Sequence, residues 1–246
     1  MRAAARVVAE RRGGRSRCTT LRSSPPLTLR ATAGGLHLVG TAAGPVGGDE
    51  LALEVTVTAG ARLTVRSVAA QLVLPAPTPA ASTMALAIEV GPGASLRWLP
   101  EPTVLVRGAD HRLTTTVALD GSADLEWRDE VVLGRDGEAG GSLLHRLRVE
   151  RGGRPLLCTE VALGPVWPTA AGPAATGGAR VAASVLLVGA PARSVLAGLG
   201  RGEPAAAPEG SVRAAAFALD GDAVLLSALG DEIDATRAAL HGFCRE

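Results

Sequence analysis

The sequence predicts an all-β fold, a layered, solenoid-like stack of strand–turn–strand units, with two short α-helices near the C-terminus. Apolar residues alternate with polar ones over many short segments, which is typical of strands with one buried face. Glycine-rich turns separate these segments, and one strand–turn–strand unit recurs about every thirty residues. We expect a single domain over residues 1–246, with a β-layered body over about 1–165 and a less regular part with short helices over about 166–246.

The first strands are predicted before residue 40. An Arg-Gly-Gly-Arg turn at 12–15 joins two alternating segments, and Pro25-Pro26 breaks the chain after them because proline cannot donate to a sheet ladder. The four strands predicted here are 3–9, 16–22, 27–30 and 36–39.

The stretch 44–65 organises the rest of the chain. A glycine turn ends in one acid, Asp49, and a strand follows at 51–58, with apolar residues at every second position. Two glycines before the acid allow a tight bend that brings the Asp49 carboxylate close to main-chain N–H groups. Asp49 therefore either caps its own loop or serves a function.

The turn after this strand returns along the chain. Segments 57–63, 90–96, 119–125 and, more loosely, 149–156 resemble one another and begin 33, 29 and 30 residues apart, with a late copy at 219–225. Strands flank them, and we predict these at 62–68, 84–90, 113–119 and 124–133. Such repetition is typical of stacked β layers that cover each other's apolar faces. A sandwich with regular hairpins is the alternative.

The pattern weakens after residue 163. Residues 164–178 are rich in Ala, Gly and Pro and predict a loop. Short helices are predicted at 190–199 and 231–243, the second capped by Asp231 with Ile233, Leu240 and Phe243 on one face, and 200–210 is expected to be flexible.

Composition excludes several functions. The 25 basic and 24 acidic residues balance, so nothing indicates a nucleic-acid or membrane partner, and no apolar run is long enough to span a bilayer. Lysine is absent, which rules out a P-loop or Schiff-base lysine, and three Trp and two Phe offer no stacking platform. Three distant cysteines without a C-x-x-C pair favour the reducing cytoplasm.

We expect no enzyme. The four histidines are not spaced to share a metal, and each is interpreted as a solvated or structural residue. The chain has no Gly-x-Ser-x-Gly elbow and no glycine-rich turn that opens a helix within a βαβ unit. A carboxylate-based hydrolase would need two acids that converge in a cleft.

Two further acids stand out by their phase within strands. Asp129 shares a face with Leu125, Trp127, Val131 and Leu133, and Glu160 shares one with Leu156, Cys158 and Ala162. We expect Asp49, Asp129 and Glu160 to face inward, unless a β-bulge turns either strand acid outward. Inward carboxylates without a closed coordination sphere would attract a divalent cation only transiently, so no tightly bound cofactor is expected.

Several ordered motifs resemble those of one known family. Gly44-Pro-Val-Gly-Gly-Asp-Glu-Leu is similar to the Gly-Gly-Leu-Val-Gly-Gly-Asp signature of the urease accessory proteins called UreD or UreH. Leu96-Arg-Trp-Leu-Pro-Glu resembles their Leu-Glu-Trp-Leu-Pro-Gln-Glu segment, and Gly134-Arg-Asp-Gly-Glu their Gly-Arg…Gly-Glu block. Pro25-Pro-Leu and Pro155-Leu-Leu-Cys-Thr-Glu also fall in place, so the match runs in order from about residue 3 to 163.

This resemblance implies a non-enzymatic scaffold in urease maturation. Members of the family bind the accessory protein UreF, which recruits the GTPase UreG, and together they deliver nickel to the urease apoenzyme. The resemblance makes Asp49, Asp129 and Glu160 the candidate residues of a transient nickel route, and allows a dimer within the accessory complex. The alternative is a β-layered binding or assembly module unrelated to nickel.

Overall fold

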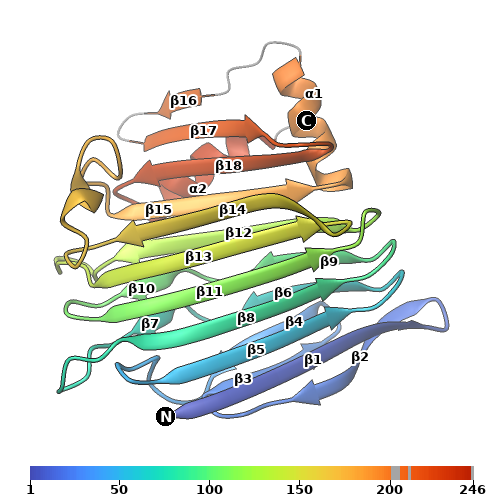
Figure 1. Ribbon diagram of the computed structural model, residues 1–246, viewed down its shortest axis with the longest axis horizontal. Helices are drawn as coiled ribbons and strands as arrows, with labels where there is room; N and C mark the ends of the chain where they lie inside the picture. Colours follow the sequence, from blue (N-terminus) through green and yellow to red (C-terminus); the bar gives the residue numbers. More distant parts are fainter. Residues whose placement is uncertain (201–205, 210–211, 245–246) are drawn as a thin grey trace.

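Two β-sheets face each other along the length of the molecule (Figure 1). The computed structural model describes residues 1–200, 206–209 and 212–244. The seven-stranded sheet, called sheet A below, has in spatial order β14 (Arg154–Leu163), β13 (Ser142–Arg151), β11 (Asp110–Leu119), β8 (Ser82–Val90), β5 (Glu50–Val57), β1 (Arg2–Arg12) and β2 (Arg15–Arg22).

The second sheet, sheet B, lies behind sheet A in Figure 1. Its main path is β16 (Ala206–Glu209), β17 (Val212–Ala218), β18 (Ala223–Gly230), β15 (Val181–Val188), β12 (Asp124–Leu133), β9 (Ser95–Leu99), β6 (Arg62–Ser67), β4 (Gly35–Gly40) and β3 (Leu27–Thr32). Two short strands, β7 (Gln71–Val73) and β10 (Thr103–Leu105), pair with each other, and β10 also pairs with β12.

The solenoid-like arrangement predicted from the repeats is confirmed. The chain passes from β5 in sheet A to β6 in sheet B, then from β8 to β9 and from β11 to β12, and successive strands of each sheet are parallel. The repeated turns are the corners between the two sheets. Each ends in an alanine, Ala61, Ala94 or Ala123, that is at most 1% exposed, because only a small side chain fits where the corners stack.

Two copies of the repeat are not corners. The segment at 149–156 is the hairpin of β13 and β14 within sheet A, and the one at 219–225 joins β17 and β18 within sheet B. Gly152 and Gly153 have φ angles of 57° and 74°, the combination that a tight hairpin turn requires. The chain therefore doubles back after β13, and the regular solenoid ends there.

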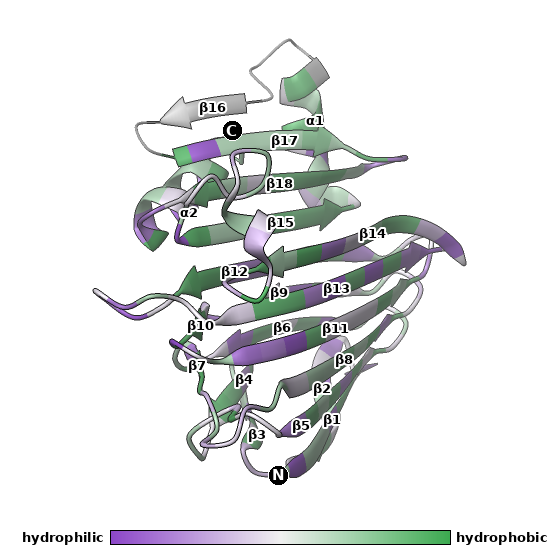
Figure 2. Cartoon of the chain, turned by 60° about the vertical axis from the view of Figure 1, so that its left-hand side comes forward, coloured by the Kyte–Doolittle hydropathy of each residue, from purple (hydrophilic) through white to green (hydrophobic). Residues whose placement is uncertain are grey.

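The predicted strands are confirmed with small shifts in their ends, and the buried apolar residues of both sheets form the main core. Figure 2 shows hydrophobic segments in the strands of both sheets. Residues 166–246, expected to be less regular, add β15, β17 and β18 to sheet B. Residues 164–178 form the predicted loop and contain only the short 3-10 helix η1 (Pro168–Ala171). Most of 200–210, expected to be flexible, lies outside the described residues, and 206–209 form β16.

The two predicted helices are present and cover the outer face of sheet B with a second apolar cluster. The first comprises a 3-10 turn, η2 (Ala190–Ala192), and α1 (Arg193–Gly200); the second is α2 (Ile233–Gly242). The cap expected from Asp231 is wrong, because the N-cap is Glu232 and it makes no side-chain capping bond. The buried face of α2 consists of Thr236, Ala239 and Leu240. Of the three residues expected there, Leu240 is buried, Phe243 is partly buried against the same cluster, and Ile233 is only partly covered.

Candidate functional site

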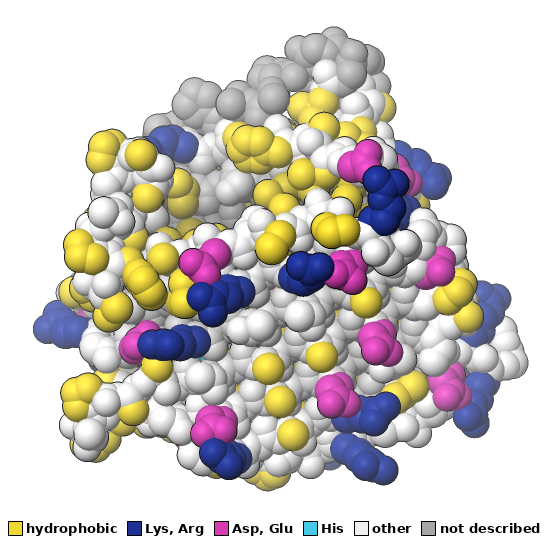
Figure 3. Space-filling model, viewed as in Figure 1, with side chains coloured by type: hydrophobic (Ala, Val, Ile, Leu, Met, Phe, Trp, Pro, Cys, Tyr) yellow, Lys and Arg dark blue, Asp and Glu magenta, His cyan; other side chains and the backbone are white. Residues whose placement is uncertain are grey.

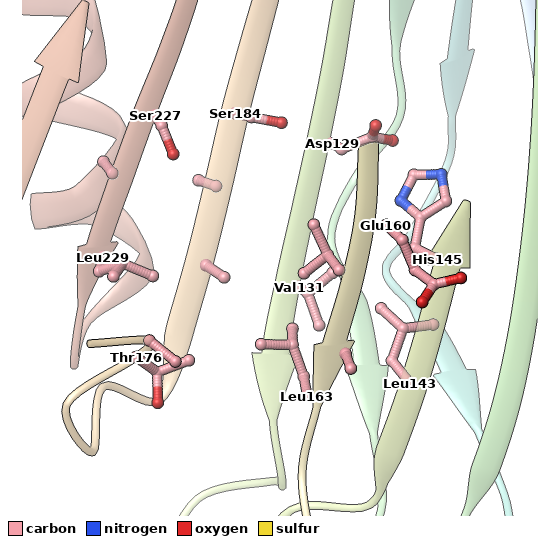
Figure 4. Close-up of a pocket in the computed structure, with 16 residues that line it drawn as sticks. Asp129, Val131, Leu143, His145, Glu160, Leu163, Thr176, Ser184, Ser227 and Leu229 are labelled. Atoms are coloured by element: carbon pink, nitrogen blue, oxygen red, sulfur yellow. The ribbon is translucent and has the colours of Figure 1, made fainter. Parts of the chain in front are cut away.

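A cavity of about 310 Å³ opens where the two sheets stop matching. Sheet A ends at β14, whereas sheet B continues through β15 and β18, so the inner faces of these two strands are only partly covered. Polar groups reach this cavity from four strands: Asp129 on β12, His145 on β13, Ser184 on β15 and Ser227 on β18 (Figure 4).

Asp129 faces the interior, as its phase predicts. The pairing of β12 with β15 runs without a shift past this residue, so no bulge turns it outward. The indole Nε1 of Trp127 donates a hydrogen bond of 2.7 Å to its Oδ2, and the Trp127 ring stacks on Trp98 with centroids 4.9 Å apart. Burial raises the pKa of the Asp129 carboxyl, and the nearby His145 and the indole N–H oppose this rise.

Two buried histidines of sheet A, together with Asp129, form a row of polar groups in the interior. His145 is buried and its Nε2 lies 3.2 Å from the hydroxyl of Thr115, while the Nδ1 of His111 lies 2.8 Å from the hydroxyl of Ser82. Burial, together with the nearby His145, lowers the pKa of His111 to about 4. His111 is therefore neutral near pH 7.

Asp49 lies immediately before β5, at the far end of this row of polar groups from the cavity. Its Oδ2 accepts a hydrogen bond of 2.9 Å from the Val46 N–H, which confirms that it caps its own loop, and its Oδ1 lies 2.8 Å from the amino group of Met1. Burial opposes its ionisation, but these two contacts outweigh that effect and lower the pKa of Asp49. The register of β5, β8 and β11 places Asp49, Ser82 and His111 side by side.

Glu160 does not face inward, contrary to expectation. Its side chain is 54% exposed and pairs with Arg146, whose Nε lies 2.5 Å from Oε2. The two residues are cross-strand partners on β14 and β13. β14 is the last strand of sheet A and only one of its residues, Leu163, is buried, so apolar phase alone did not indicate which face turns inward. Glu160 lies beside the cavity, but its carboxylate belongs to the outer surface.

The structure thus connects two of the three predicted residues through groups that the sequence analysis missed. Ser82, His111, Thr115 and His145 lie between Asp49 and Asp129 and are buried. A signal for the histidines was present: His111 is in phase with the buried Val117, and His145 with the buried Leu147. Alternation traced back to the start of each strand would have placed both rings inside.

The arrangement offers ligands one or two at a time. Within residues 1–200, 206–209 and 212–244, no three His, Cys, Asp or Glu side chains gather closely enough to hold a metal ion. The helices in this same part of the chain are too short and too polar to cross a bilayer. What the interior provides is a row of carboxylate, hydroxyl and imidazole groups that ends at a cavity.

Comparison with known proteins agrees with the motifs. A model of the UreD urease accessory protein family matches residues 1–245. The chain belongs to this family. It is 43% identical over 253 aligned residues to the urease accessory protein UreD of Parafrankia sp. (strain EAN1pec), covering 93% of this chain and 82% of the relative.

Two further relatives are similar over most of their length. The urease accessory protein UreD of Streptomyces avermitilis is 40% identical, with 94% of this chain and 96% of the relative aligned. That of Frankia alni is 42% identical, with 83% and 71% aligned. Membership of the UreD family supports a role in urease maturation.

Proposed function

We propose that this protein is a non-enzymatic urease maturation factor that joins a UreF–UreG accessory complex to the urease apoenzyme and assists nickel insertion. Family membership supports the urease part of this proposal. The observation that carries the nickel part is the buried row of polar groups from Asp49 through the two histidines to Asp129 at the cavity. We also propose that it acts in the cytoplasm and that the accessory complex can contain two copies.

The chemistry of the row suits a cation in transit. Imidazole nitrogens are good ligands for nickel, and a neutral His111 has a lone pair to offer near pH 7. The carboxylate of Asp129 supplies negative charge that compensates a divalent cation in a poorly hydrated interior, and Asp49 would do so once it releases the amino group of Met1. Because fewer than three such groups meet at any described point, a bound ion would leave quickly, as delivery requires.

The exposed Glu160 is not included in this proposed route. Its carboxylate is neutralised by Arg146 at the surface, so it neither wets the interior nor remains free to bind a cation. Glu160→Gln is therefore a matched control for Asp129→Asn. Each change replaces one carboxylate by an amide, but Glu160 lies on the outer face of sheet A and Asp129 faces the interior.

The test is reconstitution of urease activation with UreF, UreG and apo-urease. We expect Asp129→Asn and His145→Gln to lower the nickel content and the activity of the urease produced, while a pulldown and a thermal melt show that the complex forms and the protein folds. Glu160→Gln should leave nickel content unchanged. Each variant keeps a polar side chain of similar shape, so packing around the cavity changes little.

These measurements distinguish a nickel-delivering scaffold from an assembly module unrelated to nickel. Full nickel loading by the Asp129→Asn/His145→Gln double variant would refute the interior route and leave an assembly module unrelated to nickel. Loss of the complex in the pulldown would assign these residues a structural role instead. An equal loss of nickel with Glu160→Gln would show that the position of the charge inside the sheets does not matter.

A further inference from the structure

The charge of this chain is distributed unevenly along its length. Residues 1–48 contain eight of the 25 arginines but only one of the 24 acidic residues, Glu10, and so carry a net charge of +7. The rest of the chain has 17 arginines and 23 acidic residues, a net charge of −6. The near-neutral total therefore conceals a separation of charge, which can direct association with an oppositely charged partner.

The fold gathers this positive segment at one end of the molecule. β1 and β2 are the last two strands of sheet A, and β3 and β4 are the last two of sheet B at the same end. Figure 3 views the outer face of sheet A, where arginines follow the lower margin formed by β1 and β2. We call the outward-facing side of the β1–β2 hairpin, with Arg15, Arg17 and Arg22, the basic edge.

A β-bulge aligns the arginines of the basic edge. The register pairs Arg15 with Arg12, Arg17 with Glu10 and Arg22 with Arg6, and it shifts by one residue between Val8 and Ala9. Without that shift, an odd and an even position such as 17 and 22 would point to opposite faces of β2. With it, all three arginines lie opposite even-numbered residues of β1, which face outward because the odd-numbered Ala3 to Ala9 are buried.

This alignment acts against the stability of the hairpin. Two arginine pairs, Arg12 with Arg15 and Arg6 with Arg22, stand directly across from each other, and like charges in such positions are destabilising. Arg6 and Arg12 have carboxylate partners, Glu54 and Glu10.

The three arginines of β2 differ from most other arginines of sheet A, which pair with a carboxylate. Among the described residues, no carboxylate lies within ion-pairing distance of Arg15, Arg17 or Arg22. By contrast, Arg146 and Arg148 on β13 each pair with a glutamate on the same outer face. Three exposed arginines without an ion pair thus share one face of this terminal strand, where the carboxylate opposite Arg17 is Glu10, which pairs with Arg12.

We propose that the basic edge binds an extended acidic segment of a partner protein, which lies along β2 as an added strand. β2 is the terminal strand of sheet A, so its outer backbone groups are free to pair. Carboxylates at alternate positions of an added strand recur about every 6.8 Å, the spacing of Arg15 and Arg17. A nucleic acid fits less well, because residues 1–48 contain no Phe, Tyr or Trp side chain on which bases could stack. This surface is separate from the proposed nickel route.

The test titrates the full-length protein against labelled 12-residue peptides and measures fluorescence anisotropy. One peptide carries glutamate at every second position between threonines, another has the same composition with its glutamates in one block, and a third has glutamine in place of glutamate. We expect the alternating peptide to bind most tightly, to lose affinity as salt is raised, and to bind about tenfold more weakly to the Arg15→Gln/Arg17→Gln/Arg22→Gln variant.

A matched variant controls for overall charge. Arg112→Gln/Arg146→Gln/Arg148→Gln removes three exposed arginines from β11 and β13 of the same sheet and should change the affinity less than twofold. A thermal melt checks that the variants fold. If the triple variant of the basic edge unfolds, the single variant Arg17→Glu takes its place and should also weaken binding of the alternating peptide.

Three results would overturn the proposal. The first is equal weakening by both triple variants, and the second is equal binding of the glutamine peptide. The third is binding of duplex DNA at least as tightly through the same three arginines, which would mark a general polyanion surface.

Discussion

The ion pair between Arg237 and Glu130 fastens α2 to the outer face of sheet B. The guanidinium Nη2 and Nε lie 2.6 Å and 2.8 Å from the Glu130 carboxylate, whose side chain is 1% exposed. The same Nη2 lies 3.0 Å from Glu101, which precedes β10. Arg237 thus joins the C-terminal helix to two segments that are more than a hundred residues away in sequence.

The cost of removing this arginine can be worked out from its surroundings. Arg237→Met keeps most of the side-chain volume but leaves the buried Glu130 carboxylate without its main partner, which typically costs about 3–5 kcal/mol. Arg128 remains, with its Nε 4.0 Å from Glu130, so we expect the lower end, about 3 kcal/mol. For a protein of this size, that loss lowers Tm by about 6–12 °C.

Urea and thermal unfolding measure this loss, and the same strand supplies a control. Arg97 pairs with Glu126 of β12 at 2.5 Å, but Arg97 is 49% exposed, so Arg97→Met should cost less than about 1 kcal/mol. The Arg237→Met/Glu130→Met double variant should recover most of the stability, because it removes the stranded charge. Equal losses for both single arginine variants, or no recovery in the double variant, would show that Glu130 does not depend on Arg237 for its stability in the buried state.

Three further predictions concern the interior. The pKa of His111 falls from 6.5 to about 4 on folding, so the unfolded state binds more protons than the folded state between these pH values. The free energy of unfolding should therefore drop by up to about 3 kcal/mol from pH 6.5 to 4, and urea titrations at each pH should show a flatter profile for His111→Gln. Trp127→Phe removes the indole donor to the Asp129 carboxylate and should cost about 1–3 kcal/mol in the same assay. Gly141→Ala would place a Cβ 2.5 Å from a backbone oxygen and should lower Tm by several degrees, whereas Gly121→Ala, with nothing within 4 Å, should not.

The fold class could be predicted because its signals are local. Period-two alternation located the strands, and the recurrent turn located the corners. Which turn is a corner and which a hairpin could not be predicted from the repeat itself, since all copies share a glycine between apolar residues. The Gly152-Gly153 pair was the available distinction, because two adjacent positive φ angles build a tight hairpin.

The orientation of a site residue was predictable only where the alternation of apolar and polar residues assigns its side chain to one face of the sheet. Asp129 lies on a central strand with a sheet neighbour on each side, so its inward phase was correct. Glu160 lies on a terminal strand with apolar residues on both faces, and there phase does not determine orientation. The two histidines were missed for another reason. Their spacing in the sequence was judged only by whether two of them could share a metal ion, whereas each ring contacts a hydroxyl on the adjacent parallel strand.

The cavity follows from the topology of the two sheets. After β13 the chain turns back in a hairpin, so sheet A ends at β14 while sheet B gains β15, β18 and β17. The outer faces of these added strands carry apolar residues that pack against α1 and α2. Leu186 and Val188, further along β15, belong to the main core, whereas the inward positions beside the cavity include the small side chains of Ala182, Ser184 and Ser227. Larger apolar residues there would fill the space, and the facing sheet offers only a terminal strand to pack against. The row of interior polar groups therefore ends at an open cavity and not in a packed core, as the proposed passage for a cation would require.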